Sequence, residues 1–158
     1  MSLESVRAFL AVSAPDLNVL EQPGSTATVA QAAAGHGVDP AQIAKTLALR
    51  AGERVLLLVT RGDSRLDNQK AKACFGGKVK MLAGDEVTAL TGHPVGGVCP
   101  FGLSTALPVY CDISLQAFAE VIPAAGSINS ALRISPMRMA ELAQATWVDV
   151  CVSTSAIG

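Results

Sequence analysis

The stretch of the chain best suited to chemistry is residues 92–102, which read GHPVGGVCPFG and contain four glycines and two prolines. Glycine permits positive φ angles and proline fixes φ, so such a segment can turn its backbone N–H groups towards one point. N–H groups arranged in this way bind an anion, or the oxyanion that forms when a carbonyl group is attacked. A tightly packed structural turn with no ligand is the alternative that composition leaves open.

The same stretch offers a nucleophile. Cys99 and His93 lie six residues apart across the turn, and a Cys–His pair can act as a thiolate nucleophile and its base. No residue that would orient the imidazole can be identified from the sequence. Walker-type, dinucleotide-binding, G-x-S-x-G and H-E-x-x-H motifs are absent. The four cysteines fit neither a C-x-x-C motif nor a zinc ribbon, so we expect no metal and no cofactor.

Positive charge is concentrated in the middle of the chain. Residues 45–80 contain nine of the twelve basic residues and three acidic ones, a net charge of +6 in a chain whose total is −1. A local positive field of this kind can attract a polyanion, although a solvated face of scattered lysines is the simpler explanation.

The elements that must position these residues alternate between helices and strands. Two compact apolar runs, 44–52 and 53–62, predict a hairpin. Capping residues and helical spacing predict helices at 2–13, 28–37, 66–76, 83–92, 114–121 and 135–146, with further strands at 17–22, 107–113, 121–127, 129–135 and 148–153. This order predicts an α+β or mixed α/β fold with a partly antiparallel sheet.

Length and composition indicate one folded domain spanning residues 1–158. Half of the residues are hydrophobic and 16% are charged, as in ordinary globular proteins. The first residues lack the pattern of a signal peptide, and the apolar runs are too short to span a bilayer. We therefore expect a cytoplasmic protein.

Four blocks of the sequence carry a resemblance to a known family. They are GSTATVAQAA, QIAKTLALR, DEVTALTGHPVGGVCPFG and GSINSALRISP, in this order. Together they resemble the YbaK / prolyl-tRNA synthetase-associated editing domain family, over residues 6–148. The resemblance implies a curved, mainly antiparallel sheet flanked by helices. It also implies a trans-acting deacylase that hydrolyses the ester bond of mischarged aminoacyl-tRNA.

The resemblance assigns roles to particular positions. The near-invariant lysine of the family falls on Lys45, and its G-x-x-x-P loop falls on residues 96–100. The implied catalytic groups are Lys45, Gly96 and Gly97. The implied substrate-binding residues are Ser25, Thr26, Thr28, Val98, Cys99, Pro100, Phe101, Gly126, Ser127 and Asn129. Members that edit alanine often carry a histidine in the late glycine-rich segment, whereas this chain has Asn129 and Ser130 there.

The expected partner is mischarged tRNA, tRNA-Pro or a related one, carrying a small acyl group such as Ala, Cys, Ser or Thr. Prolyl-tRNA synthetase is a possible second partner, no membrane is involved, and the expected state is a monomer or weak homodimer. Within the basic segment, Arg65, Lys70 and Lys72 are the candidates for contacting the tRNA. Two rival functions stay open: a module that binds an uncharged tRNA end or a nucleotide without hydrolysis, and a hydrolase that depends on Cys99.

Overall fold

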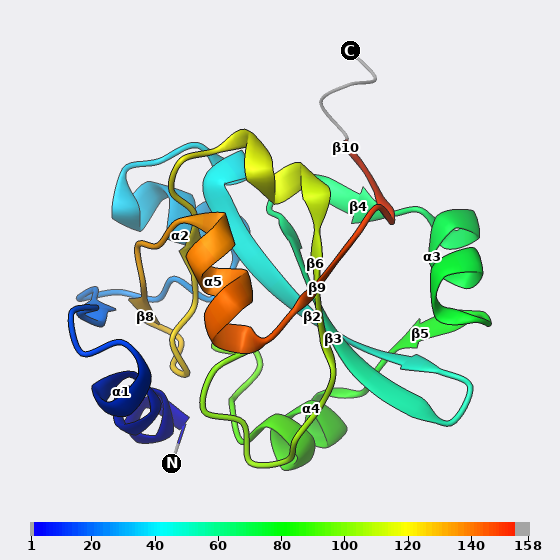
Figure 1. Ribbon diagram of the computed structural model, residues 1–158. Helices are drawn as coiled ribbons and strands as arrows, with labels where there is room; N and C mark the ends of the chain where they lie inside the picture. The colour runs from blue at the N-terminus through cyan, green and yellow to red at the C-terminus, as the bar shows by residue number, and fades with distance from the viewer. Residues whose placement is uncertain (1, 154–158) are drawn as a thin grey trace.

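A six-stranded mixed sheet forms the centre of the protein in the computed structural model, which describes residues 2–153 (Figure 1). Five strands follow the order β5-β2-β3-β6-β9, and β7 pairs with β2. Their bounds are β2 Ile43–Ala51, β3 Arg54–Arg61, β5 Val79–Met81, β6 Val109–Asp112, β7 Ile122–Pro123 and β9 Thr146–Val148. Two small antiparallel pairs, β1 Leu20–Glu21 with β8 Ser130–Ala131 and β4 Ser64–Leu66 with β10 Cys151–Ser153, complete the strands.

The hairpin predicted from the two apolar runs is confirmed and dominates the sheet. β2 and β3 pair antiparallel from Ala44↔Arg61 to Ala51↔Arg54, and β5 extends the antiparallel part. The strands β6, β7 and β9 join their neighbours in parallel. The expected mixed α/β class with a largely antiparallel sheet is therefore confirmed.

The outer edge of β2 is interrupted, and this interruption positions the site described below. β7 pairs with β2 only at Ile43 and Ala44, and β5 pairs only from Leu49 onwards. Between them, the carbonyl of Ala48 accepts a hydrogen bond from the N–H of Leu82. Main-chain groups of an antiparallel strand point alternately to its two sides. The N–H and C=O of Thr46, two residues before Ala48, therefore point out of the sheet edge into the gap.

Capping side chains mark the starts of the helices at 29–36, 68–75 and 136–143, and a glycine ends each of the helices at 29–36, 68–75 and 84–91. They are α1 Ser2–Ser13, α2 Val29–His36, α3 Asn68–Phe75, α4 Gly84–Thr91 and α5 Pro136–Ala143, with 3-10 helices η1 Pro40–Gln42 and η2 Ile113–Ala117. Thr28 caps α2 through a capping box with Gln31, and Gly37 ends the helix at φ 68°. Asp67 caps α3 without a capping box, its side chain accepting from the N–H groups of Gln69 and Lys70, and Gly76 ends this helix at φ 77°.

Several elements differ from the sequence predictions. The strands expected at 17–22, 121–127 and 129–135 are each reduced to two residues, β1, β7 and β8, and the last helix ends at Ala143 rather than at 146. The helix expected at 114–121 is the shorter η2. The single strand expected at 148–153 is divided between β9 and β10, because Asp112 accepts the N–H of Val150 and removes it from a strand ladder. The strands β4 and β5 were not predicted, because three residues are too few to establish an alternating pattern.

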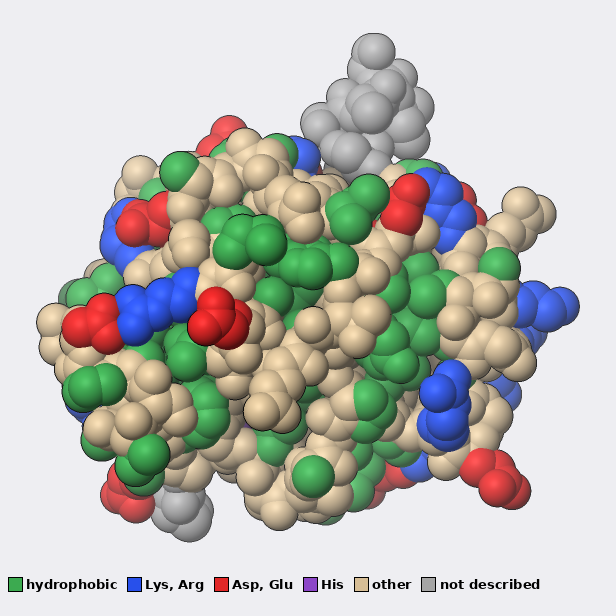
Figure 2. Space-filling view, in the orientation of Figure 1, with side chains coloured by type: hydrophobic (Ala, Val, Ile, Leu, Met, Phe, Trp, Pro, Cys, Tyr) green, Lys and Arg blue, Asp and Glu red, His purple; other side chains and the backbone are tan. Residues whose placement is uncertain are grey.

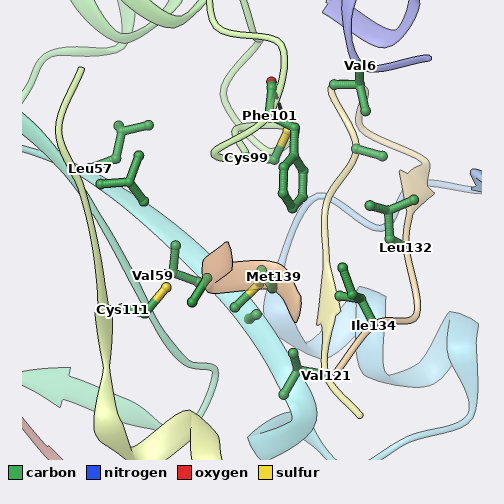
Figure 3. Close-up of a cluster of buried hydrophobic side chains, with 14 of the residues drawn as sticks. Val6, Leu57, Val59, Cys99, Phe101, Cys111, Val121, Leu132, Ile134 and Met139 are labelled. Atoms are coloured by element: carbon green, nitrogen blue, oxygen red, sulfur yellow. Dashed lines mark hydrogen bonds between the residues drawn. The ribbon is translucent and has the colours of Figure 1, made fainter. Parts of the chain in front are cut away.

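Apolar side chains cover both faces of the sheet. Ala44, Ala48, Leu57 and Val59 face the larger cluster, and Figure 3 shows residues of this cluster around Met139 of α5. The intervening residues of the hairpin, Leu49, Leu56 and Leu58 among them, face the smaller cluster beneath α3. The surface seen in Figure 2 carries charges of both signs, scattered rather than gathered by sign. Within residues 2–153, no helix is long and apolar enough to cross a membrane.

Candidate active site

A pocket of about 310 Å³ lies at the interrupted edge of β2. Its walls come from the start of α2, from β2, from the end of β5 with α4, from the turn before the buried Cys99, and from β7 and β8. The lining is mainly apolar, with a small number of polar groups, which is typical of a site for a small ligand or part of a larger one. The sequence-predicted residues that line it are Thr26, Thr28, Lys45, Gly96 and Val98.

Lys45 lines this pocket, but its amine is hydrogen-bonded to a residue that does not line it. Its Nζ donates a hydrogen bond of 2.8 Å to the carbonyl oxygen of Ser64 in β4. Burial lowers the pKa of this amine, while nearby Cys151 and Asp63 act in the opposite direction. An ammonium group has three N–H donors, so the bond to Ser64 leaves two for a ligand.

The glycine- and proline-rich turn at residues 92–102 borders the pocket with its first half. Gly96 and Val98 lie there and have free main-chain N–H groups within residues 2–153. Gly96 has φ 92°, and a Cβ at this position would lie 2.7 Å from the Cβ of Ala27, so only glycine fits. Among residues 2–153, the N–H groups of Gly96 and Val98 donate to no other protein atom. The N–H of Gly97 is instead occupied by the carbonyl of Pro94, at 2.9 Å.

Gly97 serves close packing. A Cβ there would lie 2.8 Å from the backbone of Ser127, and the Gly97 carbonyl accepts a bond from Gly126. Gly126 itself has φ 95°, and its own Cβ would collide with the Ser2 carbonyl at 2.6 Å. These two glycines therefore join the turn to the late glycine-rich segment, and neither lines the pocket.

The second half of the turn belongs to the core. Cys99 and Phe101 are fully buried and Pro100 is buried as well. The Phe101 ring stacks on Phe9 of α1 with centroids 6.0 Å apart, and Figure 3 shows Cys99 and Phe101 on the same side of the larger cluster. The structure therefore places these three predicted substrate-binding residues behind the pocket wall rather than on it.

The geometry of Cys99 and His93 does not suit a nucleophile and its base. The two side chains are in contact, at 3.6 Å between Sγ and Nε2. However, His93 Nε2 also lies 2.7 Å from the Phe101 carbonyl, which can only accept, so this nitrogen carries the proton and cannot take one from the thiol. Burial raises the pKa of the Cys99 thiol to about 12. The thiol is therefore protonated near neutral pH and shielded from the pocket.

Ser25, Thr26 and Thr28, predicted to bind substrate, use their hydroxyl groups in hydrogen bonds around the start of α2. Thr28 Oγ1 accepts the N–H of Gln31, and Ser25 Oγ bonds to the Gln31 side chain and accepts the N–H of Ala27. Thr26 Oγ1 donates to the carbonyl of Ile128, so this threonine ties α2 to the late segment. Thr28 therefore caps α2 and also lines the pocket wall.

Ser127 and Asn129 form a hydrogen-bonded segment behind the pocket. Ser127 Oγ bonds to Asn129 Oδ1 and to Ser130 Oγ, and Ser130 reaches the pocket wall. Asn129 Nδ2 donates to the carbonyl of Gln22, which follows β1. Neither Ser127 nor Asn129 lines the pocket, so both hold the residues that do.

The candidate tRNA contacts lie away from the pocket wall. Lys70 forms an ion pair of 3.2 Å with Asp149, while Arg65 and Lys72 are exposed. Arg65 directly follows Ser64, whose carbonyl oxygen accepts the hydrogen bond from Lys45 Nζ. Of the three candidates, Arg65 is therefore next in the chain to a residue that contacts Lys45.

The sequence did not predict most of the apolar lining or, among the polar residues, two whose buried atoms are unpaired within residues 2–153. His36, in the last turn of α2, and Thr46, in β2, both line the pocket. Each carries a buried polar atom with no hydrogen-bond partner in the described part of the chain, His36 Nε2 and Thr46 Oγ1. No motif marks these positions, and only the contact of α2 with the gap in β2 brings them to one site. Within residues 2–153, no group of three His, Cys, Asp or Glu side chains is arranged to hold a metal ion.

Comparison with known proteins identifies the class to which this fold and pocket belong. The family model of the aminoacyl-tRNA editing domain matches residues 23–142, which include every residue that lines the pocket. The class is that of aminoacyl-tRNA deacylases, hydrolases that act on the ester bond of mischarged tRNA. The chain belongs to this aminoacyl-tRNA editing domain family.

Individual relatives are similar over different lengths. The uncharacterized protein YwhH of Bacillus subtilis (strain 168) is 45% identical over 96% of this chain and 98% of its own length. A proline–tRNA ligase of Geobacter sp. (strain M21) is 34% identical over 67% of this chain, which corresponds to only 19% of the ligase. A crystal structure described as "a putative trans-editing enzyme for prolyl tRNA synthetase" superposes with a TM-score of 0.89 at 33% identity, covering 96% of this chain and 98% of that one.

Proposed function

We propose that this protein removes a small amino acid in trans from mischarged tRNA-Pro or a closely related tRNA, and that the pocket at the gap in β2 is its active site. The observation that carries the proposal is that Lys45 lines one small pocket with Gly96 and Val98, whose main-chain N–H groups donate to no atom of residues 2–153. Relatives support the choice of tRNA: an Enterococcus faecalis protein 28% identical over 72% of this chain is named "Putative Cys-tRNA(Pro)/Cys-tRNA(Cys) deacylase EbsC".

The reaction is the attack of water on the carbonyl carbon of the ester. The C–O bond to the terminal ribose breaks, the ribose oxygen takes a proton, and the products are a free amino acid and a deacylated tRNA. The N–H groups of Gly96 and Val98 stabilise the oxyanion that forms during the attack. One such donor is worth about 3 kcal/mol, or a hundredfold in rate. We assign this role to Val98 in place of Gly97, whose N–H is occupied by Pro94.

Lys45 and Thr46 hold the two ends of the acyl ester. The amine of Lys45 binds the ribose or phosphate of the terminal nucleotide with the N–H groups that Ser64 leaves free. The outward carbonyl of Thr46 accepts a hydrogen bond from the α-ammonium group of the amino acid. Fixing a reactive ester in this way contributes several kcal/mol without a covalent intermediate. This is why the site can work with so few reactive side chains.

The test is a deacylation panel. tRNA-Pro charged with Ala, Cys, Ser, Thr or Pro is incubated with the protein, with and without prolyl-tRNA synthetase, and release of the amino acid is followed. We expect release of at least one small amino acid and none of proline. Release that depends on the synthetase would show that the two proteins associate. Absence of release from every charged tRNA, with binding of the tRNA end retained, would instead favour the non-catalytic binding module.

The first prediction concerns Lys45. Lys45→Met keeps the aliphatic stem but removes the charge, and we expect deacylation to fall about a hundredfold because the ester is no longer held. The matched control is Lys80→Met, at an exposed lysine of β5 that does not line the pocket, and it should keep its activity. Nearly full activity of a folded Lys45→Met protein would contradict the site assignment.

A further inference from the structure

The pocket contains polar atoms that the proposed reaction does not use. His36 is 7% exposed, and its Nε2 has no hydrogen-bond partner among residues 2–153. Thr46 Oγ1 is buried in the same way. Both residues line the pocket, one from α2 and the other from the gap in β2. A buried polar atom without a partner is destabilising, so its presence in a binding pocket indicates that a ligand completes it.

The hydrogen bonds around His36 define what kind of partner its free nitrogen needs. His36 Nδ1 lies 3.3 Å from the side-chain nitrogen of Gln22, which can only donate, so Nδ1 is the acceptor. A neutral imidazole with Nδ1 as acceptor carries its proton on Nε2. The pKa of His36 is lowered by burial and by the nearby charge of Arg133, which favours the neutral ring. The free atom is therefore an N–H donor that lacks an acceptor.

The orientation of His36 is fixed through a chain of contacts. Asn129 donates to the Gln22 carbonyl, and Gln22 N–H donates to the Asn129 carbonyl, so the backbone of Gln22 is held on both sides. The Gln22 side chain in turn reaches His36, and Arg133 donates to the His36 carbonyl at 2.7 Å. A donor positioned this firmly discriminates well, because the rest of the site does not adjust when its partner is missing.

We propose that His36, assisted by Thr46, selects an acyl group whose side chain carries a hydroxyl, of the serine or threonine class, over an alkyl group of the same size. This inference rests on the proposed function and names the substrate class of that site. A hydroxyl oxygen accepts the His36 proton and exchanges a second hydrogen bond with Thr46 Oγ1. An ethyl group fits the same space but leaves both buried atoms unpaired. The thiol of cysteine is a weak acceptor and ranks between the two.

The size of the expected preference follows from the unpaired atoms. A hydrophobic pocket separates groups that differ by one methylene only modestly, whereas a site built to hydrogen-bond a hydroxyl rejects the analogue that lacks it much more strongly. We expect seryl-tRNA to be hydrolysed at least about tenfold faster than the isosteric 2-aminobutyryl-tRNA, the lower limit for one buried hydrogen bond that is lost.

The experiment measures single-turnover deacylation of one tRNA-Pro charged with serine, 2-aminobutyrate or alanine. The variant His36→Leu removes the donor at similar volume, and we expect the serine rate to fall about tenfold to meet an unchanged 2-aminobutyrate rate. The variant His36→Gln restores an N–H donor and should recover part of the preference. A crystal structure with a non-hydrolysable seryl analogue should place the hydroxyl within hydrogen-bond distance of His36 Nε2.

Each outcome has a distinct meaning. Equal rates for serine and 2-aminobutyrate in the unaltered protein would overturn the inference even if His36→Leu does not fold. An equal loss for both substrates in His36→Leu would also overturn it, since His36 would then contact the ribose common to both. Hydrolysis of alanine alone would overturn the inference and leave the deacylase function standing. Failure to release any amino acid would remove the proposed function itself.

Discussion

Whether a side chain of this protein can react or bind depends on its burial more than on its distance from a suitable partner. Cys99 and His93 touch, yet both are fully buried, and the imidazole nitrogen that faces the thiol already bonds to the Phe101 carbonyl. Lys45 is only partly buried and lines a pocket, and its amine, bonded to the Ser64 carbonyl, retains two further N–H donors. The Cys99 thiol, which is intrinsically the stronger nucleophile, is thus inert, whereas the Lys45 ammonium group retains N–H donors for binding.

At this scale we predict that Cys99→Ala changes the deacylation rate less than about threefold. The thiol, with its pKa raised to about 12, supplies no thiolate at neutral pH. The variant should lose about 1 kcal/mol of stability because a buried sulfur is removed. Rates are measured beside denaturant unfolding, with Cys74→Ala at the exposed cysteine as the control. A hundredfold loss of rate in a folded Cys99→Ala protein would restore the thiol-dependent mechanism.

The elements of the fold contribute main-chain groups rather than side chains. β2 loses its neighbour between β7 and β5, and this frees the outward groups of Thr46. Gly96, at φ 92°, lines the same pocket, and its N–H donates to no atom of residues 2–153. A site of this kind depends on the exact path of the backbone, so it is sensitive to changes that leave every reactive side chain in place.

The prediction at the scale of elements compares two glycines with positive φ. Gly96→Ala must accommodate φ 92° and a Cβ 2.7 Å from Ala27, so we expect deacylation to fall by at least about a hundredfold as the oxyanion donors shift. Gly37→Ala, at φ 68° with open space around it, should lose about 1 kcal/mol of stability and keep its rate. Parallel changes in rate for both variants would mean that Gly96 matters only for folding.

At the scale of the whole molecule, charge is distributed unevenly along a chain of nearly zero net charge. The segment 45–80 carries +6, and it includes the exposed Lys72 in α3. In Figure 1, α3 lies at the opposite end of the molecule from α1. We infer that the acceptor stem of the tRNA crosses the side of this basic segment, where Arg65, Lys70 and Lys72 are the candidate contacts.

We therefore predict that Lys72→Glu raises the KM for charged tRNA several-fold and leaves kcat unchanged, because a phosphate contact contributes to binding alone. The control is Arg7→Glu in α1, an equal change of charge at the far end of the molecule. The KM of the unaltered protein should rise with salt, and less steeply in Lys72→Glu. An identical response of the two variants would place the tRNA elsewhere.

The sequence by itself determined the class of fold and the central hairpin. Capping pairs such as Thr28 with Gln31, and Asp67 at α3, act over a few residues, and so do the apolar runs of β2 and β3. The resemblance to the editing family also directed attention to Lys45 and to the turn at Gly96. These features are local, so their patterns are present in the order of residues.

Only the tertiary structure decided which of the candidate residues share a pocket. Gly96 and Val98 border it, whereas Cys99, next in the chain, is fully buried in the core. His36 and Thr46 meet at the site because α2 lies against an edge of β2 that neither β5 nor β7 covers. Contacts between segments distant in the sequence leave no local pattern, and for this reason the donor at His36 could not be predicted.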